Sequence, residues 1–415
     1  MKTKLVSVML TLMLVLLSSL TALALASENQ PIEISVQDVW ADSLQWGKVW
    51  LKTIDLFEKN NPNIKIDRIY VPLGQNIERV LLGTKTKSLP DVITCDTQDI
   101  PHLAEAGALL DLSQFINEWG KWDDVFPASQ SAVTWKNKPY AIQFTTNTIA
   151  LHYNKSFFEE AGLSGPPETW DDLSIWAEKL TKSDRYGYAF SAFSSEEATW
   201  HFEPFLWSNG GDLLALDRPE AINALEFHTS FVKKGFTSPD VVNWNQGDVG
   251  VQFRLGKTAM MIQGCWDIPS SIEAGMDFDI AKIPPPKAGM PTIGPIGGEP
   301  FGISPFSSEE KQKAAWEFLK FLMEDTGMKF FNANVYNVPT RKSIAPDVVN
   351  DLPLLKPFLE TLENGRNRFE YGGGVKYPNV SMITREAIQK VIIGEATAEE
   401  ACKEAAAKIR ELMQE

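Results

Sequence analysis

Strand-like and helix-like segments alternate near the start of the chain, and this order constrains the fold more than any other feature. Apolar and polar residues alternate over Ile32–Val39 and again over Ile64–Tyr70, which predicts two strands. Between them, Leu44–Lys59 carries a broad apolar face, which predicts a helix. A helix over Asn76–Thr86 and a short buried strand over Asp91–Cys95 continue the pattern. Such alternation favours an α/β fold with a parallel sheet.

The same rhythm resumes in the second half of the chain. The predicted strands there are Tyr140–Phe144, Ile149–Tyr153, Gly187–Phe190, Ala259–Gln263 and Phe278–Lys282, and the predicted helices are Thr169–Thr181, Pro219–Lys234 and a helix ending at Glu324. Capping-box patterns, Ser307 with Glu310 and Thr397 with Glu400, precede that helix and the last one. No repeat of 20–50 residues is visible. Two α/β lobes fit 415 residues better than one very large sheet.

The N-terminal segment has the order of a secretory signal peptide. Lys2 and Lys4 precede an apolar run over Leu5–Leu17, and small residues lead to Ala26. The apolar run is shorter than the ~20 residues that span a bilayer. No Cys follows the small residues, so no lipid anchor is expected. The sequence therefore predicts a signal peptide over residues 1–26 and a mature protein in the periplasm or another extracytoplasmic space.

Composition and missing motifs exclude several classes of protein. The chain has 39 Lys and Arg against 54 Asp and Glu, a net charge of −15, so it repels nucleic-acid phosphates. Three cysteines are too few for a disulfide framework, and Cys95, Cys265 and Cys402 are expected to be buried apolar residues, with one pair left open. His-Glu-x-x-His, Cys-x-x-Cys and Gly-x-Ser-x-Gly are absent, and the four histidines are scattered.

Two further patterns carry no catalytic chemistry. Gly250–Thr258 resembles a phosphate-binding loop, but its glycines stand one residue too far apart. Adjacent acids such as Glu196 and Glu197 are sequence neighbours at predicted helix starts, whereas a glycosidase needs two carboxylates facing each other across a sugar. We therefore expect no enzyme, no cofactor and no metal.

Several segments together resemble the extracellular solute-binding proteins of sugar-type ABC importers, the group that includes the maltose-binding proteins. The matching blocks are Leu56–Ile66, Leu89–Leu112, Asn147–Trp170, Phe253–Trp266, Ala314–Leu322 and Gly394–Ala401. Each block is modest alone, but their shared order covers nearly the whole chain.

This resemblance implies a two-lobed α/β periplasmic-binding-protein fold with a multi-crossing hinge, of type II and of the larger sugar-binding cluster. It places the crossings near Phe144–Ile149, Glu299–Pro305 and Tyr336–Lys342. The N-terminal lobe would comprise residues 27–146 plus 304–338, and the C-terminal lobe residues 147–303 plus 339–415. Ligand would lie in the cleft, and hinge bending would close the lobes on it. The implied partners are a sugar or oligosaccharide and the transmembrane subunits of a permease, with the protein itself a monomer.

The candidate ligand-binding residues follow from sugar chemistry and from the resemblance. Aromatic rings can cover the apolar faces of a sugar, while carboxylates and amides bind its hydroxyls. This gives some of the 13 tryptophans a use, although most are expected in the core. The candidates, at predicted strand ends, loops and crossings or at family contact positions, are Trp40, Asp42, Asp96, Gln98, Asn147, Glu203, Phe205, Trp244, Trp266, Glu299 and Tyr371.

Departures from the maltose-binding branch leave the ligand open. That branch has Tyr where Phe205 stands, Trp where Cys95 stands and a further Trp near Arg385, so a maltodextrin is not implied. The first hypothesis is the sugar-binding component of an importer. A second is binding of an anionic polyol such as glycerol phosphate, which would need cleft arginines. The arginines available for it are Arg254, Arg341, Arg366, Arg368 and Arg385. A third, of another class, is a secreted carbohydrate-active enzyme with an opposed carboxylate pair.

Overall fold

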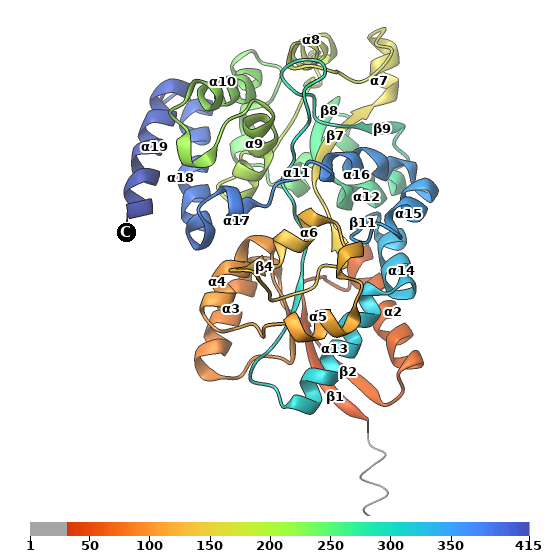
Figure 1. Ribbon diagram of the computed structural model, residues 1–415. Helices are drawn as coiled ribbons and strands as arrows, with labels where there is room; N and C mark the ends of the chain where they lie inside the picture. The colour runs from red at the N-terminus through yellow and green to blue at the C-terminus, as the bar shows by residue number, and fades with distance from the viewer. Residues whose placement is uncertain (1–30, 415) are drawn as a thin grey trace, which may run out of the picture.

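The computed structural model of the chain describes residues 31–414 and has two α/β lobes, drawn one above the other in Figure 1. The lower, N-terminal lobe is called the N lobe here, and the upper one the C lobe. The predicted signal peptide over residues 1–26 lies outside the described residues. Between residues 31 and 414, no helix is both long and apolar enough to cross a membrane.

The N lobe is built on a four-stranded sheet in the order β10-β3-β1-β2. Its strands are β1 (Ile32–Asp38), β2 (Ile64–Tyr70), β3 (Val92–Thr94) and β10 (Phe301–Ile303). β1 runs parallel to β2 and β3, as the alternation predicts, and β10 pairs antiparallel to β3. The other elements of this lobe are α2 (Gln45–Asn60), α3 (Leu73–Thr86), η1 (Thr97–Asp99), α4 (Ile100–Glu105), α5 (Ser113–Trp119), η2 (Trp122–Asp124), α6 (Pro127–Ala132), β4 (Thr134–Trp135), β5 (Lys138–Pro139), α13 (Glu309–Met323) and α14 (Asp325–Val335).

The C lobe is built on a three-stranded sheet in which β7 (Ile149–Asn154) is central. β7 pairs antiparallel with both β8 (Met260–Gly264) and β9 (Phe278–Ala281), so the expectation of parallel strands is wrong in this lobe. The other elements are α7 (Lys155–Glu160), α8 (Trp170–Leu180), α9 (Glu196–Ser208), η3 (Leu213–Ala215), α10 (Pro219–Lys233), η4 (Pro239–Val242), α11 (Gln246–Arg254), η5 (Cys265–Asp267), α12 (Ile268–Glu273), α15 (Ala345–Asp351), η6 (Pro353–Leu355), α16 (Lys356–Leu362), α17 (Arg368–Tyr371), η7 (Gly374–Lys376), α18 (Tyr377–Ile392) and α19 (Ala398–Gln414).

Two predicted strands, Tyr140–Phe144 and Gly187–Phe190, form only isolated bridges, to Phe301 and to Met261. The second lies too close to a helix for an ordinary side chain at its first residue, because a Cβ on Gly187 would be 1.9 Å from the carbonyl oxygen of Ala177 in α8. The expectation of regular strands is therefore wrong for both segments.

The predicted helix caps are present, with one shift. Thr169 and Asp172 form a capping box at α8, and Thr397 does the same with Glu400 before α19. At α13 the cap is Ser308, not the expected Ser307. Ser307 instead donates its hydroxyl to Asp91 Oδ1 at 2.7 Å, so this cap prediction is wrong by one residue.

The segments that connect the lobes lie side by side. β6 (Thr145–Thr146) pairs antiparallel with β11 (Val338–Pro339), and Asn147 exchanges backbone hydrogen bonds with Gly297. Gly298 has a φ of +122°, which side-chain-bearing residues rarely adopt. Because β10 belongs to the N-lobe sheet, we draw the middle lobe boundary before Phe301 rather than after residue 303.

Candidate functional site

Two chain segments face each other across the lobe boundary, residues 96–105 of the N lobe and residues 367–377 of the C lobe. The first contains η1 and α4, and the second contains α17, η7 and the start of α18. Helix α4 contacts η7, and Asn367 Nδ2 donates to the carbonyl oxygen of Ser131 at 3.0 Å. Figure 1 shows α17 above α4 and β4 at this boundary. Both lobes therefore contribute side chains to one region.

Arg368 lies at the centre of this contact. Its side chain is 3% exposed, and its guanidinium carbon lies 4.6 Å from the centroid of the Trp200 ring. It forms an ion pair with Asp96 of the N lobe and another with Glu196 of α9, at 3.0 Å. It also donates to Thr97 Oγ1 at 2.9 Å. One guanidinium thus links the two lobes through charge-assisted hydrogen bonds.

Two carboxyl groups near Arg368 keep an oxygen without a hydrogen-bond partner among the described residues. Glu203, fully buried on α9, accepts from the Tyr377 hydroxyl through Oε1 at 3.0 Å, and its Oε2 is unpaired. Glu299, beside the crossing segments, also has a buried and unpaired Oε2. Buried acceptors of this kind are rare because each forfeits the hydrogen bonds it made to water. The Nε of Arg368, a buried donor, likewise has no partner within residues 31–414, so the cluster holds both unsatisfied acceptors and an unsatisfied donor.

The pKa values of these acids reflect their burial. Burial raises the pKa of Glu203 well above its ordinary value, and the nearby carboxyl of Glu196 adds to the rise. Burial raises the pKa of Glu299 to about 7, with Asp96 adding to the rise and Arg368 opposing it. Burial, followed by repulsion from Asp96, raises the pKa of Asp99 in η1 to about 8. The region is therefore acidic and poorly hydrated.

A hollow of about 540 Å³ opens on the same two segments. It is lined by His102 and Glu105 of α4, Trp135 and Lys136 at the β4–β5 turn, and Val375 of η7. Trp135 Nε1 donates to Glu105 Oε1 at 2.6 Å, and Lys136 Nζ pairs with the same oxygen at 2.5 Å. The volume lies within the range of small-molecule sites. The indole of Trp135 is held at the lobe boundary.

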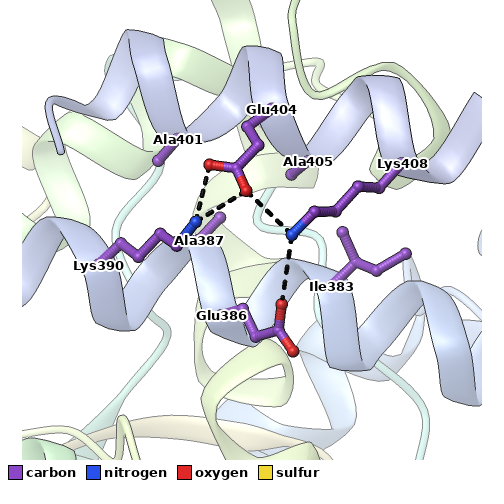
Figure 2. Close-up of a pocket in the computed structure, with 8 residues that line it drawn as sticks. All are labelled: Ile383, Glu386, Ala387, Lys390, Ala401, Glu404, Ala405 and Lys408. Atoms are coloured by element: carbon purple, nitrogen blue, oxygen red, sulfur yellow. Dashed lines mark hydrogen bonds and ion pairs between the residues drawn. The ribbon is translucent and has the colours of Figure 1, made fainter. Parts of the chain in front are cut away.

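A second hollow, between α18 and α19, has only about 10 Å³, room for at most one water. Figure 2 shows the ion pairs that cross it, from Lys390 to Glu404 and from Lys408 to both Glu404 and Glu386. This is a seam between two packed helices rather than a ligand site.

The structure places four of the candidates proposed from sequence, Asp96, Gln98, Glu203 and Glu299, at or beside the Arg368 region. The backbone amide of Gln98 donates to Asp96 Oδ1 at 3.3 Å. Asn147 is buried on a crossing segment. Tyr371 is 40% exposed on α17.

The other candidates lie elsewhere. Trp40 and Phe205 are buried in the lobe cores, with Trp40 packed on Trp50 at 5.0 Å between ring centroids. Asp42 is exposed in the turn between β1 and α2. Trp244 and Trp266 are half-buried in the C lobe.

Sequence reasoning missed Trp135 and the central role of Arg368. Arg368 appeared among the available arginines, but no local pattern shows that α17 meets η1 and α9. Glu196 was read as a helix-start acid, and it does stand in the first turn of α9. Trp135 directly precedes a tight turn, in which Lys136 and Asn137 have φ values of 48° and 62°. The signal that the sequence offered was this aromatic residue beside a turn. An aromatic residue at a turn tip is a frequent site of binding.

The remaining reactive residue types are structural. Cys95, Cys265 and Cys402 are buried and unpaired, which confirms the expectation of small apolar residues. His152 and His201 are fully buried, and burial lowers the pKa of each to about 3. Across residues 31–414, no group of three or more His, Cys, Asp or Glu side chains is arranged to hold a metal ion.

Comparison with known proteins places the chain in a family context. Residues 52–357 match the family described as bacterial extracellular solute-binding protein. The galactooligosaccharide-binding protein of Bacillus subtilis (strain 168) is 23% identical over 388 residues, which are 89% of this chain and 87% of that protein.

Solved structures agree on the fold. A solute-binding protein of Thermotoga lettingae, bound with α-D-tagatose, is 25% identical and superposes with a TM-score of 0.81, over 92% of this chain and 100% of that chain. The maltose-bound MalE3 of T. maritima is 24% identical, with the same TM-score and the same coverage. These matches confirm the two-lobed α/β fold and the resemblance to maltose-binding-like proteins.

Proposed function

Because the chain belongs to the bacterial extracellular solute-binding protein family, we propose that it binds a sugar or oligosaccharide between its lobes and delivers it to the membrane subunits of an ABC importer. The family implies work outside the cytoplasm. Relatives named for galactooligosaccharides and structures bound to tagatose and maltose support a carbohydrate. The observation that carries the proposal is the lobe boundary itself, where Arg368 of the C lobe pairs with Asp96 of the N lobe, and where a hollow lined by Trp135 and Val375 opens between the same two segments.

The chemistry of this region suits a polyhydroxyl ligand. A sugar hydroxyl could donate to the unpaired Oε2 atoms of Glu203 and Glu299, and the indole of Trp135 could cover an apolar sugar face. Ligand entry would need the Asp96–Arg368 contact to open, and closure would restore a contact across the lobes. We propose that Asn147, which is buried on a crossing segment, also makes a polar contact with the ligand.

The remaining sequence candidates keep distinct proposed roles. Gln98, Trp244, Trp266 and Tyr371 stay candidates for ligand contact. We assign Trp40 and Phe205 to support of the lobe cores, since both rings are buried there. Asp42 stays a candidate for contact at the rim, since its side chain is exposed.

We propose no catalysis. Glu196 and Glu203 both accept from the single hydroxyl of Tyr377, so they lie side by side. A glycosidase places its two carboxylates on opposite sides of the scissile bond. The ligand would leave unchanged, and the protein would act as a monomer.

A thermal-shift screen tests the proposal. The mature protein would be heated with glucose, galactose, tagatose, maltose, maltotriose and galactooligosaccharides. A cognate sugar should raise Tm, with about 2.7 kcal/mol of stabilisation at one hundred times Kd. Failure of every carbohydrate, while ligands of another class raise Tm, would reject the sugar-binding function. A sugar that raises Tm but disappears over hours would indicate an enzyme instead.

A further inference from the structure

We propose that Gly374 is a positioning residue for ligand capture, because it lets the C lobe close against the indole of Trp135 in the N lobe. This inference rests on the proposed sugar-binding function and names a contact that holds the closed form. It is carried by the geometry between the Gly372–Gly374 segment, called the triglycine turn here, and the end of β4.

The indole of Trp135 meets the C lobe at two places. Its ring stands edge-on to the ring of Phe369 in α17, with 6.1 Å between the centroids and 81° between the planes. A Cβ on Gly374 would lie 2.9 Å from Trp135 Cη2, closer than Cβ atoms approach another heavy atom. Any side chain at Gly374 would therefore press on the indole, whereas glycine leaves both groups in place.

The indole is held from the N-lobe side. Trp135 Nε1 donates to Glu105 Oε1 at 2.6 Å, and the Lys136 ammonium lies 5.8 Å from the centroid of the Trp135 ring. On the other side, Phe369 is only 3% exposed, so the ring beside the indole is itself packed in the C lobe. The indole therefore has little room to retreat from an added Cβ.

The triglycine turn is held from the C-lobe side. A Cβ on Gly373 would lie 3.1 Å from the sulfur of Met413 in α19, so the backbone of the turn is already close to that helix. Lys376 Nζ, just after the turn, donates to the carbonyl oxygen of Leu412 at 2.6 Å. Because α19 lies behind the turn, the turn cannot easily move away from the N lobe.

Other contacts across this boundary come from the same short segment of the C lobe. Asn367 donates to the carbonyl oxygen of Ser131, and Arg368 pairs with Asp96. Contacts of this kind exist only while the lobes are together, so a side chain at Gly374 would penalise the closed form and leave the open form unaffected. The apparent affinity for a sugar that needs the closed form then falls with the population of that form.

Gly374→Ala tests the inference, with Gly162→Ala as the matched control. Both glycines lie in the C lobe with similar φ values, 64° and 67°, but a Cβ on Gly162 would meet nothing within 4 Å. Backbone strain should therefore lower Tm by a similar amount in both variants. Calorimetry with maltose, maltotriose, tagatose and a galactooligosaccharide measures Kd. Only Gly374→Ala should weaken binding, by about fivefold or more. Stopped-flow fluorescence should assign this loss mainly to faster dissociation of the sugar.

A compensating substitution separates this contact from a general loss of structure. Trp135→Phe shortens the ring that meets the turn, so the extra methyl group of Gly374→Ala should fit beside it. Adding Gly374→Ala should then cost far less affinity in the Trp135→Phe background than in the parent. Should Gly374→Ala not fold, Gly374→Asn beside Gly162→Asn makes the same comparison, because asparagine tolerates a positive φ.

Two results would overturn the inference while leaving sugar binding intact. The first is equal sugar affinity in Gly374→Ala and Gly162→Ala. The second is a loss of affinity from Gly374→Ala that has the same size with and without Trp135→Phe. If none of the sugars binds the parent protein, the sugar-binding function fails, and this inference falls with it.

Discussion

The ionisation of single carboxyl groups at the lobe boundary depends on their burial and on whether their oxygens have hydrogen-bond partners. Glu203 and Glu299 each keep an unpaired acceptor oxygen, while Asp96 is engaged by Arg368. Glu203 and Glu299 ionise less readily than in water, because desolvation disfavours their charged forms. Their protonation can therefore be read out through stability as well as through binding.

Glu299→Gln should change the pH dependence of stability. The pKa of Glu299 is raised from 4.5 to about 7 by burial, so its protonated form favours the folded state. That contribution is complete below about pH 4.5 and is lost as pH rises through 7. The Tm of the variant relative to the parent should rise between pH 4.5 and 7 and then level off. A constant difference across this range, measured by calorimetry, would show that Glu299 ionises normally.

Trp135→Ala should weaken sugar binding several-fold to tenfold. The indole lines the 540 Å³ hollow, and removal of an aromatic surface from a sugar face costs about 0.5–1.5 kcal/mol. The matched control is Trp176→Ala, since Trp176 is half-buried on α8 and donates to the Gly165 carbonyl oxygen. Titration of the intrinsic fluorescence, or calorimetry, measures the sugar affinity of both variants. Equal affinity in the parent and Trp135→Ala would remove Trp135 from the site.

At the scale of elements, local chemistry fixes helix ends better than strand pairing. The α8 capping box satisfies two helix-terminal donors, because Thr169 Oγ1 accepts from the Asp172 amide at 3.2 Å and Asp172 accepts from the Thr169 amide at 3.0 Å. Strand pairing instead depends on segments distant in sequence. The antiparallel partners of β7 lie more than a hundred residues away.

Thr169→Ala should lower the stability of the protein by about 1 kcal/mol, the usual cost of losing an N-cap. The control is Thr326→Ala, in the exposed first turn of α14, where the change should have little effect. Denaturant unfolding of both variants measures the difference. An unchanged unfolding midpoint for Thr169→Ala would mean that tertiary packing alone holds the start of α8.

The sequence predicted what local patterns and family blocks encode, and little of what depends on long-range contact. β1, β2, α2 and α10 match their apolar periodicity within a residue or so. Gly187–Phe190 forms only an isolated bridge to Met261, although backbone hydrogen bonds join it to β8 and its first residue lies against α8. Periodicity cannot show these contacts. Asp96, Glu203 and Glu299 were proposed as contacts, but the guanidinium that gathers them came from a segment about 165 residues after Glu203. Only the folded arrangement of α9, α17 and η1 reveals that cluster.

At the scale of the whole molecule, the crossings, the Arg368–Asp96 ion pair and the Asn367–Ser131 hydrogen bond join the lobes. The crossings are backbone-paired through β6 and β11, while Arg368 bridges the lobes through side-chain contacts beside the crossing at residues 296–298. Such a geometry allows the lobes to rotate about the crossings when the bridge opens.

Asp96→Asn should shift the ligand-free protein toward more separated lobes. The substitution keeps the shape of the side chain but removes the charge that Arg368 meets across the boundary. Without sugar, small-angle scattering should show a larger radius of gyration for Asp96→Asn than for the parent. The matched control Asp42→Asn, at an exposed carboxylate of the same lobe, should have the radius of the parent. An identical radius of gyration in Asp96→Asn and the parent would show that this ion pair does not hold the ligand-free lobes together.

The most direct test of ligand capture between the lobes is a lobe-to-lobe distance measured with and without sugar. Labels on Lys85→Cys in α3 and Lys403→Cys in α19 stand on exposed positions of the two lobes, and the natural cysteines are buried. A saturating sugar should shorten the label distance and narrow its distribution, and the sugar should be recovered intact. An unchanged distance distribution with a sugar that binds tightly would contradict capture between the lobes.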